Sequence, residues 1–237
     1  MLSILIPVFN EADILECSVE RVHSYLDARG LKHEILVVSN GSTDATNLVG
    51  AALAQKLPWF RFFTLSERSV GRAFSKAAAE AASEFLVSLD IDLSFDLRFM
   101  DYAHDLLQYA DMVVGSKTMG KQRRSPLRVL ASQTYITFAQ LLFGITISDY
   151  SIGCKAYRRS SILPALPQIS AWTGYPLELI LFLKQRGNRI IQVGVDCDDR
   201  RKSHFNLLHE GFFRYAHVFH CWRALRSGRS WMNQEVP

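Results

Sequence analysis

Residues 86–94 read Leu-Val-Ser-Leu-Asp-Ile-Asp-Leu-Ser, an apolar run that ends in two carboxylates. Residues 85–89 have the length and composition of a buried strand. On an extended chain, residues two apart point to the same side, so Asp90 and Asp92 can face one point. Two carboxylates at one edge of a sheet suit Mg²⁺ or Mn²⁺. The alternative is a polar strand end, or Asp92 as the N-cap of a following helix.

Upstream of this stretch, apolar runs alternate with segments of helical periodicity. The predicted strands are residues 2–8, 34–39 and 61–65, and the predicted helices are residues 13–29, 44–56 and 73–83. This order is typical of an α/β fold with a doubly wound, mostly parallel sheet and helices on both faces. Such sheets bind ligands beyond the carboxyl ends of their strands. Three polar strand ends, at residues 10–11, 40–42 and 90–92, are therefore expected to open on one edge.

Downstream, the pattern is less regular. It predicts helices at residues 96–109, 127–143, 160–166, 175–185 and 207–226, and strands at residues 111–115, 154–157 and 189–195. The chain contains neither G-x-G-x-x-G nor G-x-x-x-x-G-K-[ST], so neither a dinucleotide fingerprint nor a P-loop is indicated.

Composition narrows the class of protein further. The chain has 237 residues, is 49% hydrophobic and carries a net charge of +4, which suits one large domain with a sizeable core. Four cysteines without a C-x-x-C pair indicate a reducing compartment and argue against a zinc or redox motif. Pro7 and Asn10 interrupt the first apolar run, so we expect no signal peptide. No apolar run reaches about 18 residues, so we expect no transmembrane helix.

Basic residues gather in two places, at residues 121–128 and 200–202. Such groups bind phosphates, anionic lipid or nucleic acid, or form a solvated face. The last predicted helix mixes aromatic residues with Arg214, Arg223 and Arg226. That pattern is typical of an amphipathic helix lying at a membrane interface, and also of a helix packed on the core.

Six short motifs lie in order along most of the chain. The first two are residues 4–11, Ile-Leu-Ile-Pro-Val-Phe-Asn-Glu, and residues 40–46, Asn-Gly-Ser-Thr-Asp-Ala-Thr. They resemble the Ile-Pro-X-Tyr-Asn-Glu opening and the Asp-Asp-Gly-Ser-Thr-Asp-Gly-Thr loop of the inverting family 2 glycosyltransferases. Asp90-Ile91-Asp92 matches the family's Asp-X-Asp motif. Residues 115–117, 149–155 and 201–205 are similar to the Gly-Ser-Arg, Asp-X-Thr-Ser-Gly-Phe-Arg and Arg…Ser-Lys motifs of the dolichyl-phosphate mannose synthase branch.

The resemblance implies a GT-A fold and sugar transfer from a nucleotide-sugar, GDP-mannose or UDP-glucose, with inversion. It divides residues 1–200 into a nucleotide-sugar-binding half (1–116) and an acceptor half (117–200). Residues 201–237 then form a basic loop and an amphipathic helix that attaches the enzyme peripherally to the cytoplasmic face of a membrane, alone or with a separate membrane subunit. No nucleic-acid partner is implied.

The resemblance also assigns donor-side roles. The metal, Mg²⁺ or Mn²⁺, would be held by Asp90 and Asp92, with Ser94 in place of a better Gln ligand. Asn40 stands where the family has a carboxylate against the base; an amide keeps an acceptor oxygen but adds N–H donors. Arg72 and Lys76 reach the donor phosphates or form a solvated helix face. The full set of implied nucleotide-sugar-binding residues is Pro7, Asn10, Glu11, Asn40, Ser42, Arg72, Lys76, Asp90 and Ile91.

In the implied branch the acceptor is a polyprenyl phosphate. The matching acceptor-phosphate residues are Lys117, Arg128, Ser132, Ser203 and His204, and the implied catalytic set is Asp90, Asp92, Lys117, Arg128 and Arg201. A phosphate is already ionised near neutral pH and needs no general base. A sugar hydroxyl, the alternative acceptor on a glycan or glycolipid, would need one, and Asp149 and Glu178 are the candidates. Less favoured are a nucleotidyltransferase and a catalytically silent membrane-binding protein with the same fold.

Overall fold

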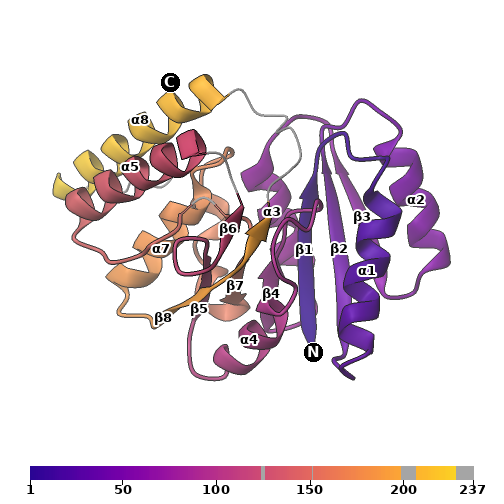
Figure 1. Ribbon diagram of the computed structural model, residues 1–237. Helices are drawn as coiled ribbons and strands as arrows, with labels where there is room; N and C mark the ends of the chain where they lie inside the picture. The colour runs from indigo at the N-terminus through magenta and orange to yellow at the C-terminus, as the bar shows by residue number, and fades with distance from the viewer. Residues whose placement is uncertain (124–125, 151, 199–206, 228–237) are drawn as a thin grey trace.

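The computed structural model describes residues 1–123, 126–150, 152–198 and 207–227 (Figure 1). Its seven-stranded sheet has the order β3-β2-β1-β4-β7-β5-β8. The strands are β1 (Leu2–Val8), β2 (His33–Asn40), β3 (Phe60–Leu65), β4 (Phe85–Ser88), β5 (Met112–Ser116), β7 (Lys155–Arg158) and β8 (Ile190–Gly194). The helices are α1 (Leu15–Asp27), α2 (Thr46–Lys56), α3 (Val70–Glu80), α4 (Phe99–Leu106), α5 (Pro126–Phe143), α6 (Arg159–Ile162), α7 (Tyr175–Gln185) and α8 (Leu207–Arg226).

Strand direction brings the polar strand ends together. β1 pairs in parallel with both β2 and β4, and β2 pairs in parallel with β3. Only β7, which lies between β4 and β5, runs antiparallel to its two neighbours. The carboxyl ends of β1, β2 and β4 therefore share one edge, at the top of the sheet in Figure 1. The predicted mostly parallel α/β fold is confirmed.

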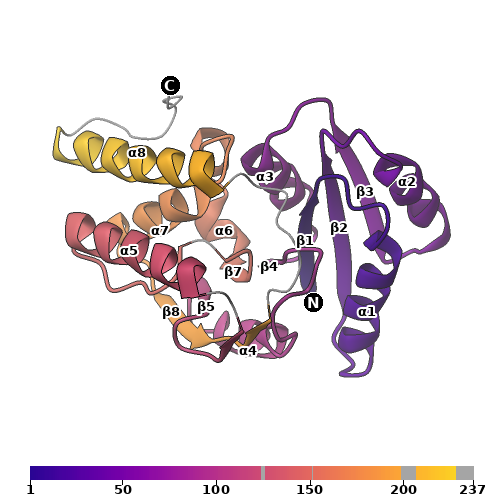
Figure 2. The same ribbon diagram turned by 45° about the horizontal axis from the view of Figure 1, so that its top comes forward.

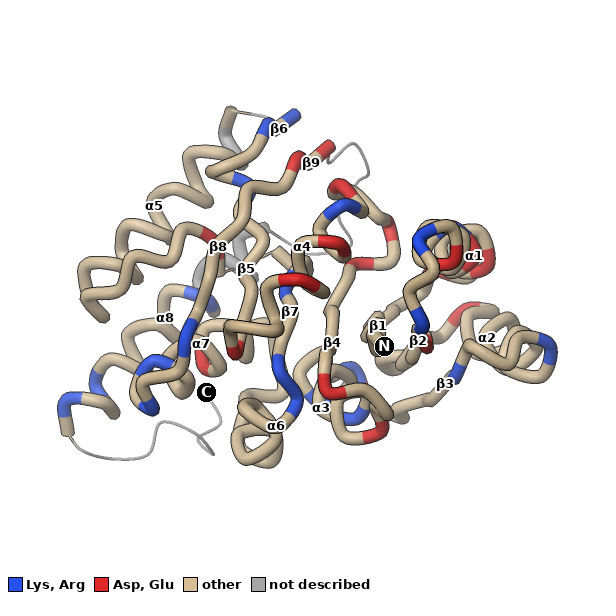
Figure 3. Tube along the Cα trace, turned by 90° about the horizontal axis from the view of Figure 1, so that it is seen from below, with Lys and Arg blue, Asp and Glu red and all other residues tan. Residues whose placement is uncertain are grey.

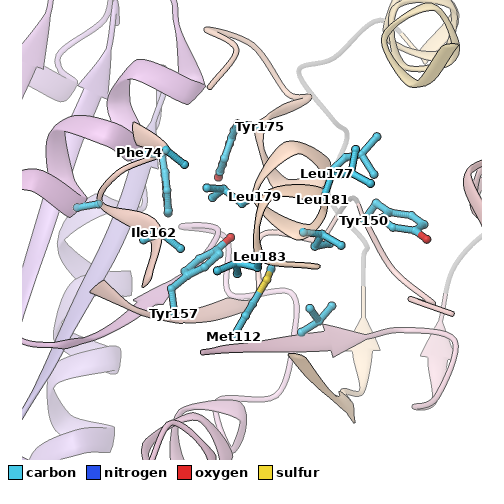
Figure 4. Packing of buried hydrophobic residues seen from close by; sticks show 14 of the residues in the cluster. Phe74, Met112, Tyr150, Tyr157, Ile162, Tyr175, Leu177, Leu179, Leu181 and Leu183 are labelled. Atoms are coloured by element: carbon cyan, nitrogen blue, oxygen red, sulfur yellow. The ribbon is translucent and has the colours of Figure 1, made fainter. Parts of the chain in front are cut away.

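Each face of the sheet carries its own core. Side chains alternate along β1, so that Leu5 packs on one side while Ile4 and Ile6 pack on the other. The second side is covered by α1 and α4. The first is covered by α3 and α7, where Phe74 of α3 stacks on Tyr175 at 4.7 Å between ring centroids (Figure 4). This contact joins α3, which packs on β1 and β2, to α7, which packs on β8.

Two helices form an outer layer on the second half of the chain. α5 and α8 lie side by side over α7, and Thr134 of α5 contacts the Tyr215 hydroxyl of α8 at 3.0 Å (Figure 2). In the part of the chain that the structure describes, neither these helices nor any other is both long and apolar enough to span a membrane.

Several element boundaries differ from the prediction. α3 begins at Val70 rather than residue 73, because the Ser69 hydroxyl caps it by accepting the Arg72 N–H at 3.4 Å. The helix predicted at residues 160–166 is α6 followed by a separate 3₁₀ turn, η1 (Leu166–Gln168). The pattern gave no sign of a small second sheet, in which β6 (Gln122–Arg123) pairs with β9 (Cys197–Asp198), since two-residue strands have no detectable periodicity.

Candidate active site

The Asp90-Ile91-Asp92 stretch is a turn rather than a strand end. β4 ends at Ser88, and the Leu93 N–H donates to the Asp90 carbonyl at 3.1 Å with Leu93 at a φ of 46°. The expectation that both carboxylates project from extended backbone is therefore wrong. The turn still brings them close, because the Asp92 charge is one of the causes that raise the pKa of Asp90. Ile91, between them, is buried in the core and anchors the turn.

Asp90 is held by the backbone of a distant loop. Its Oδ2 accepts the Gly153 N–H at 3.2 Å. A Cβ on Gly153 would lie 2.2 Å from Asp90 Oδ1, so only glycine permits this approach. The Asp90 side chain keeps contact with solvent, yet the protein around it and the neighbouring Asp92 raise the pKa of its carboxyl, while Lys117 lowers it. A bound cation would relieve this unfavourable placement of negative charge.

The donor atoms at this turn fit a hard divalent ion. One oxygen of each carboxylate is engaged, by the Gly153 N–H for Asp90 and by the Ser94 N–H at 3.1 Å for Asp92. The other oxygens, Asp90 Oδ1 and Asp92 Oδ2, accept no hydrogen bond from the described residues. Carboxylate and hydroxyl oxygens are the ligands that Mg²⁺ and Mn²⁺ prefer. Asp90, Asp92 and Ser94 are the residues that would hold such an ion.

Two buried lysines lie behind the turn. Lys117, just after β5, places Nζ 3.6 Å from Asp149 Oδ2, and its backbone N–H donates to the same oxygen. Lys155, on β7, is 1% exposed and donates from Nζ to the Ile152 carbonyl. Burial lowers the pKa of Lys155 to about 8. Both cations act on the Asp90 carboxyl by lowering its pKa.

Lys155 stands at the last position of the motif at residues 149–155, where the family has arginine, but the resemblance assigned it no role in the site. Its signal was present, since a lysine inside the predicted strand at residues 154–157 has no solvated face to occupy. Asp149 itself is fully buried, and its Oδ1 accepts the Ile152 N–H at 3.1 Å. Residues 149–155 thus link Asp90, through Gly153, to Lys117, through Asp149.

The ends of β1 and β2 are tied to each other. Asn10, at a φ of 55°, accepts the Thr43 N–H on Oδ1 at 2.8 Å, and the Ser42 hydroxyl accepts the Asn10 N–H at 3.1 Å. The Glu11 N–H donates to the Thr46 hydroxyl at 2.9 Å. Pro7 is half-buried inside β1. These hydrogen bonds fix the turn after β1 against the turn after β2, at the carboxyl edge of the sheet.

Asn40 ends β2 and is 6% exposed. Its Oδ1 accepts the backbone N–H of Ser69, at the start of α3. Gly41 follows at a φ of 69°, and a Cβ there would lie 2.8 Å from the backbone of residues 67 and 68. Beside it, the Arg68 guanidinium stacks over the Phe9 ring at 4.0 Å and lies 5.5 Å from the Trp172 ring.

Arg72 and Lys76 pair with glutamates near α3, and neither contacts Asp90 or Asp92 in the part of the chain that the structure describes. Arg72 Nη1 is 3.9 Å from Glu67 Oε2, with both side chains mostly exposed. Lys76, one helical turn further, pairs with Glu80 at 2.9 Å and lies 5.2 Å from the Phe63 ring. Lys76 is therefore directed to the β3 side of α3, in agreement with the solvated-face alternative.

Part of the implied acceptor set cannot be placed. Arg201, Ser203 and His204 lie outside the described residues, as does the side chain of Arg128 on α5. Ser132 is half-buried on α5.

Glu178 is a core residue of α7 and does not lie on the surface of the helix. It is 3% exposed, its Oε1 is 2.7 Å from His217 Nε2 of α8, and its Oε2 accepts the Ser170 N–H at 2.6 Å. The Cys221 sulfur lies almost equally far from both ring nitrogens of His217, at 3.8 and 4.0 Å. The Cys221 sulfur therefore lies beside the His217 ring and does not face the lone pair of one ring nitrogen.

Comparisons with known proteins identify the family of this chain. The model of glycosyl transferase family 2 matches residues 3–163, which include β1 to β7 and the acidic turn. The chain belongs to glycosyl transferase family 2. It is 30% identical over 165 residues to a polyprenol monophosphomannose synthase of Mycolicibacterium smegmatis, covering 66% of this chain and 61% of the relative. It is 28% identical over 166 residues to an undecaprenyl-phosphate 4-deoxy-4-formamido-L-arabinose transferase of Edwardsiella ictaluri, covering 69% and 50%.

The chain thus spans about half to three-fifths of the length of these two family members. Among solved structures it is similar to glucosyl-3-phosphoglycerate synthase of Mycobacterium tuberculosis in complex with UDP, with a TM-score of 0.71 at 18% identity, covering 97% of this chain and 81% of the other. The same synthase has been solved with Mn²⁺ and UDP-glucose. At this identity the likeness shows the fold alone, and it confirms the predicted GT-A type.

Proposed function

We propose that this chain carries a metal-dependent, inverting glycosyltransferase that moves a hexose from a nucleotide-sugar to a polyprenyl phosphate. The observation that carries the proposal is the pairing of opposite charges at one sheet edge. An acidic turn with free carboxylate oxygens stands next to the buried cations Lys117 and Lys155. The first suits a metal-bound diphosphate, and the second suits an anionic acceptor.

On the donor side, Asp90, Asp92 and Ser94 hold Mg²⁺ or Mn²⁺. When bound, the ion neutralises charge that develops on the departing nucleoside diphosphate. Gly153 keeps Asp90 in place through its N–H. The first donors to test are GDP-mannose and UDP-glucose.

On the acceptor side, the buried lysines favour a phosphate over a sugar hydroxyl. Lys117 provides a fixed positive charge without the two-pronged geometry of an arginine. A phosphate oxygen attacks the anomeric carbon without a base, because a phosphate monoester is ionised near neutral pH. The hydroxyl alternative lacks a suitable base: both oxygens of Asp149 and both oxygens of Glu178 already accept hydrogen bonds inside the protein.

The names of the two relatives, a polyprenol monophosphomannose synthase and an undecaprenyl-phosphate 4-deoxy-4-formamido-L-arabinose transferase, support the same acceptor. Exposed apolar residues on the outer helices support attachment to a membrane surface: Leu130 and Leu141 on α5 are 61% and 79% exposed, and Phe219 on α8 is 47% exposed. Arg223 and Arg226 stand in the last turn of α8. Figure 3 shows blue, basic positions toward the end of this helix. We place this surface on the cytoplasmic face of a membrane.

A transfer assay tests the proposal. Labelled GDP-mannose and UDP-glucose are offered with Mn²⁺ to a polyprenyl phosphate and, separately, to free sugars and glycolipids. The expected result is label in the lipid phosphate fraction, with the anomeric configuration opposite to that of the donor. Label that appears only on sugar hydroxyls would overturn the acceptor assignment.

A further inference from the structure

A groove lies where α5, α7 and α8 end. It has a volume of about 390 Å³. α5 and α8 end on the same side of the molecule, away from β1 (Figure 2). Six apolar side chains from the three helix ends line the groove: Leu142, Phe143, Ile145, Leu181, Trp222 and Leu225. All of them except Leu181 are only half-buried, so the groove is open to solvent. A concave apolar surface of this size is typical of a ligand site.

The groove is also positively charged. Lys184 of α7 and Arg226 of α8 line it, and no carboxylate is among its described lining residues. The Arg226 guanidinium lies 4.5 Å from the centre of the Trp222 ring, which keeps its charge beside the apolar wall. The three surrounding stretches, residues 126–148, 179–195 and 211–227, contain neither Asp nor Glu. Charge and shape together therefore favour a ligand with an anionic head and an apolar tail.

The groove is separate from the carboxyl edge of the sheet. α7 begins beside that edge, because the Ala171 carbonyl just before it accepts the Ser69 hydroxyl, at the start of α3, at 2.8 Å. Lys184 lies in the last turn of α7, about 13 Å along the helix from Tyr175. Arg226 is likewise in the last turn of α8. The two cations of the groove thus stand at the helix ends that point away from the carboxyl edge.

We propose that the groove binds one acyl chain of an anionic phospholipid, with the lipid phosphate at Lys184 and Arg226. The inference goes beyond the proposed function, because this lipid neither donates nor accepts a sugar. The apolar walls remove the chain from water, and ammonium and guanidinium groups are strong donors to phosphate oxygens. Free phosphate would leave the apolar walls unused, and a neutral lipid would leave the cations unused. The bound lipid fixes the outer layer of α5 and α8 to a membrane surface.

Titration calorimetry tests the inference with lysophosphatidylglycerol, a single-chain anionic phospholipid, kept below its micelle concentration. Lysophosphatidylcholine with the same chain has a zwitterionic head and tests the charge. The deacylated headgroup, glycerophosphoglycerol, has no chain and tests the apolar walls. We expect one lysophosphatidylglycerol per protein chain, bound at least about tenfold more tightly than lysophosphatidylcholine, the scale of two cations at a lipid headgroup. The deacylated headgroup should show no measurable binding at the same concentration.

A double substitution, Lys184→Gln with Arg226→Gln, locates the binding site. The matched control is Lys32→Gln with Lys56→Gln, before β2 and at the end of α2, which removes the same charge far from the groove. We expect the groove variant to lose at least about tenfold in affinity for lysophosphatidylglycerol and to keep its affinity for lysophosphatidylcholine. The control should bind both lysolipids as wild type does. All four side chains are exposed, so both variants should keep the fold.

Equal affinity for the two lysolipids, or unchanged lysophosphatidylglycerol binding by the groove variant, would overturn the inference. Several lysolipids per chain would also overturn it, since they would indicate adsorption to the outer layer. Competitive displacement by a polyprenyl phosphate would assign the groove to the acceptor instead. A dimer in sedimentation with no lysolipid bound would assign it to a second copy of the chain. Each of these outcomes would leave the proposed function standing, because that is tested by sugar transfer.

Discussion

The backbone of Gly153 lies against the Asp90 carboxylate, and this contact leaves no space for a side chain. In Gly153→Ala the new methyl group would push Asp90 out of its position at the acidic turn. Because the obstacle is the end of a side chain, the fold can adjust while the metal ligand moves. A displacement of about 1 Å at a reacting site costs roughly 100-fold in rate. We expect that loss in transfer activity, with a melting temperature close to that of wild type. Full activity would mean that Asp90 need not occupy this position.

Lys155 gives a pH dependence with a definite sign. The unfolded lysine holds its proton up to about pH 10.4, whereas burial lowers the pKa in the folded protein to about 8. Between these values unfolding takes up a proton, so this group makes stability rise with pH, by at most about 1.4 kcal/mol per pH unit. Urea unfolding of wild type and Lys155→Met, compared between pH 8 and 10, separates the contribution of Lys155 from that of the other titrating groups. Lys155→Met should have a smaller rise of unfolding free energy with pH than wild type.

The exposed Lys184→Met serves as the matched control for Lys155→Met and should keep the wild-type slope. If Lys155→Met also keeps that slope, then Lys155 does not lose its proton near pH 8.

At the residue scale, the ends of the apolar strands placed Asp90, Asp92 and Asn40 at the carboxyl edge of the predicted sheet, and the resemblance added Lys117. The sequence places Lys155 inside a predicted strand, but it could not show that Lys155 lies near Asp90 or what Gly153 does there. Their importance depends on β7 entering between β4 and β5 from a distant part of the chain. It also could not tell that Glu178 is buried, since that depends on α8 lying over α7.

Among elements, the pair of α7 and α8 is joined by Glu178 and His217, which are 2.7 Å apart and both almost fully buried. In Glu178→Gln the charge is lost while the shape stays. We expect the free energy of unfolding to fall by about 1.5–3 kcal/mol, the range for a hydrogen bond to a charged group. Transfer activity should fall less than tenfold, because Glu178 is a positioning residue for α8 and has no contact with the acidic turn.

The matched control is Glu80→Gln, at a half-exposed ion pair on α3, where we expect a much smaller loss of stability than in Glu178→Gln because solvent screens the pair. A general base would behave in the opposite way: kcat would fall by about 10²–10⁴ without loss of stability. That outcome would favour a sugar hydroxyl as the acceptor.

Apolar and aromatic composition between polar segments predicted α7, α8 and β1 with the bounds that the structure has. Elsewhere local hydrogen bonds decided the ends. Ser69 moved the start of α3, and the Asp90–Leu93 turn ended β4 early. Such caps and turns depend on partners that periodicity does not contain.

For the whole molecule, α5 and α8 form one exposed layer at the end of the sheet away from α2 (Figure 1). If this layer contacts lipid, a double substitution Leu141→Glu and Phe219→Glu should lower binding to vesicles of anionic phospholipid by at least about tenfold, since it places two charges in the apolar region. Leu48→Glu, on α2 and 76% exposed in wild type, is the matched control. Equal vesicle binding by all three proteins, measured by co-sedimentation, would assign the apolar layer to another partner.

The central claim is that Asp90 and Asp92 hold a divalent ion on the diphosphate of the donor. The most direct measurement is calorimetric binding of UDP and GDP to wild type, Asp92→Ala and the exposed control Asp105→Ala, each with and without Mn²⁺. We predict that wild type and Asp105→Ala bind one nucleotide only with Mn²⁺, and that Asp92→Ala weakens this binding by at least about 100-fold, equivalent to 2.7 kcal/mol. Metal-independent binding, or equal affinity in Asp92→Ala, would contradict the claim.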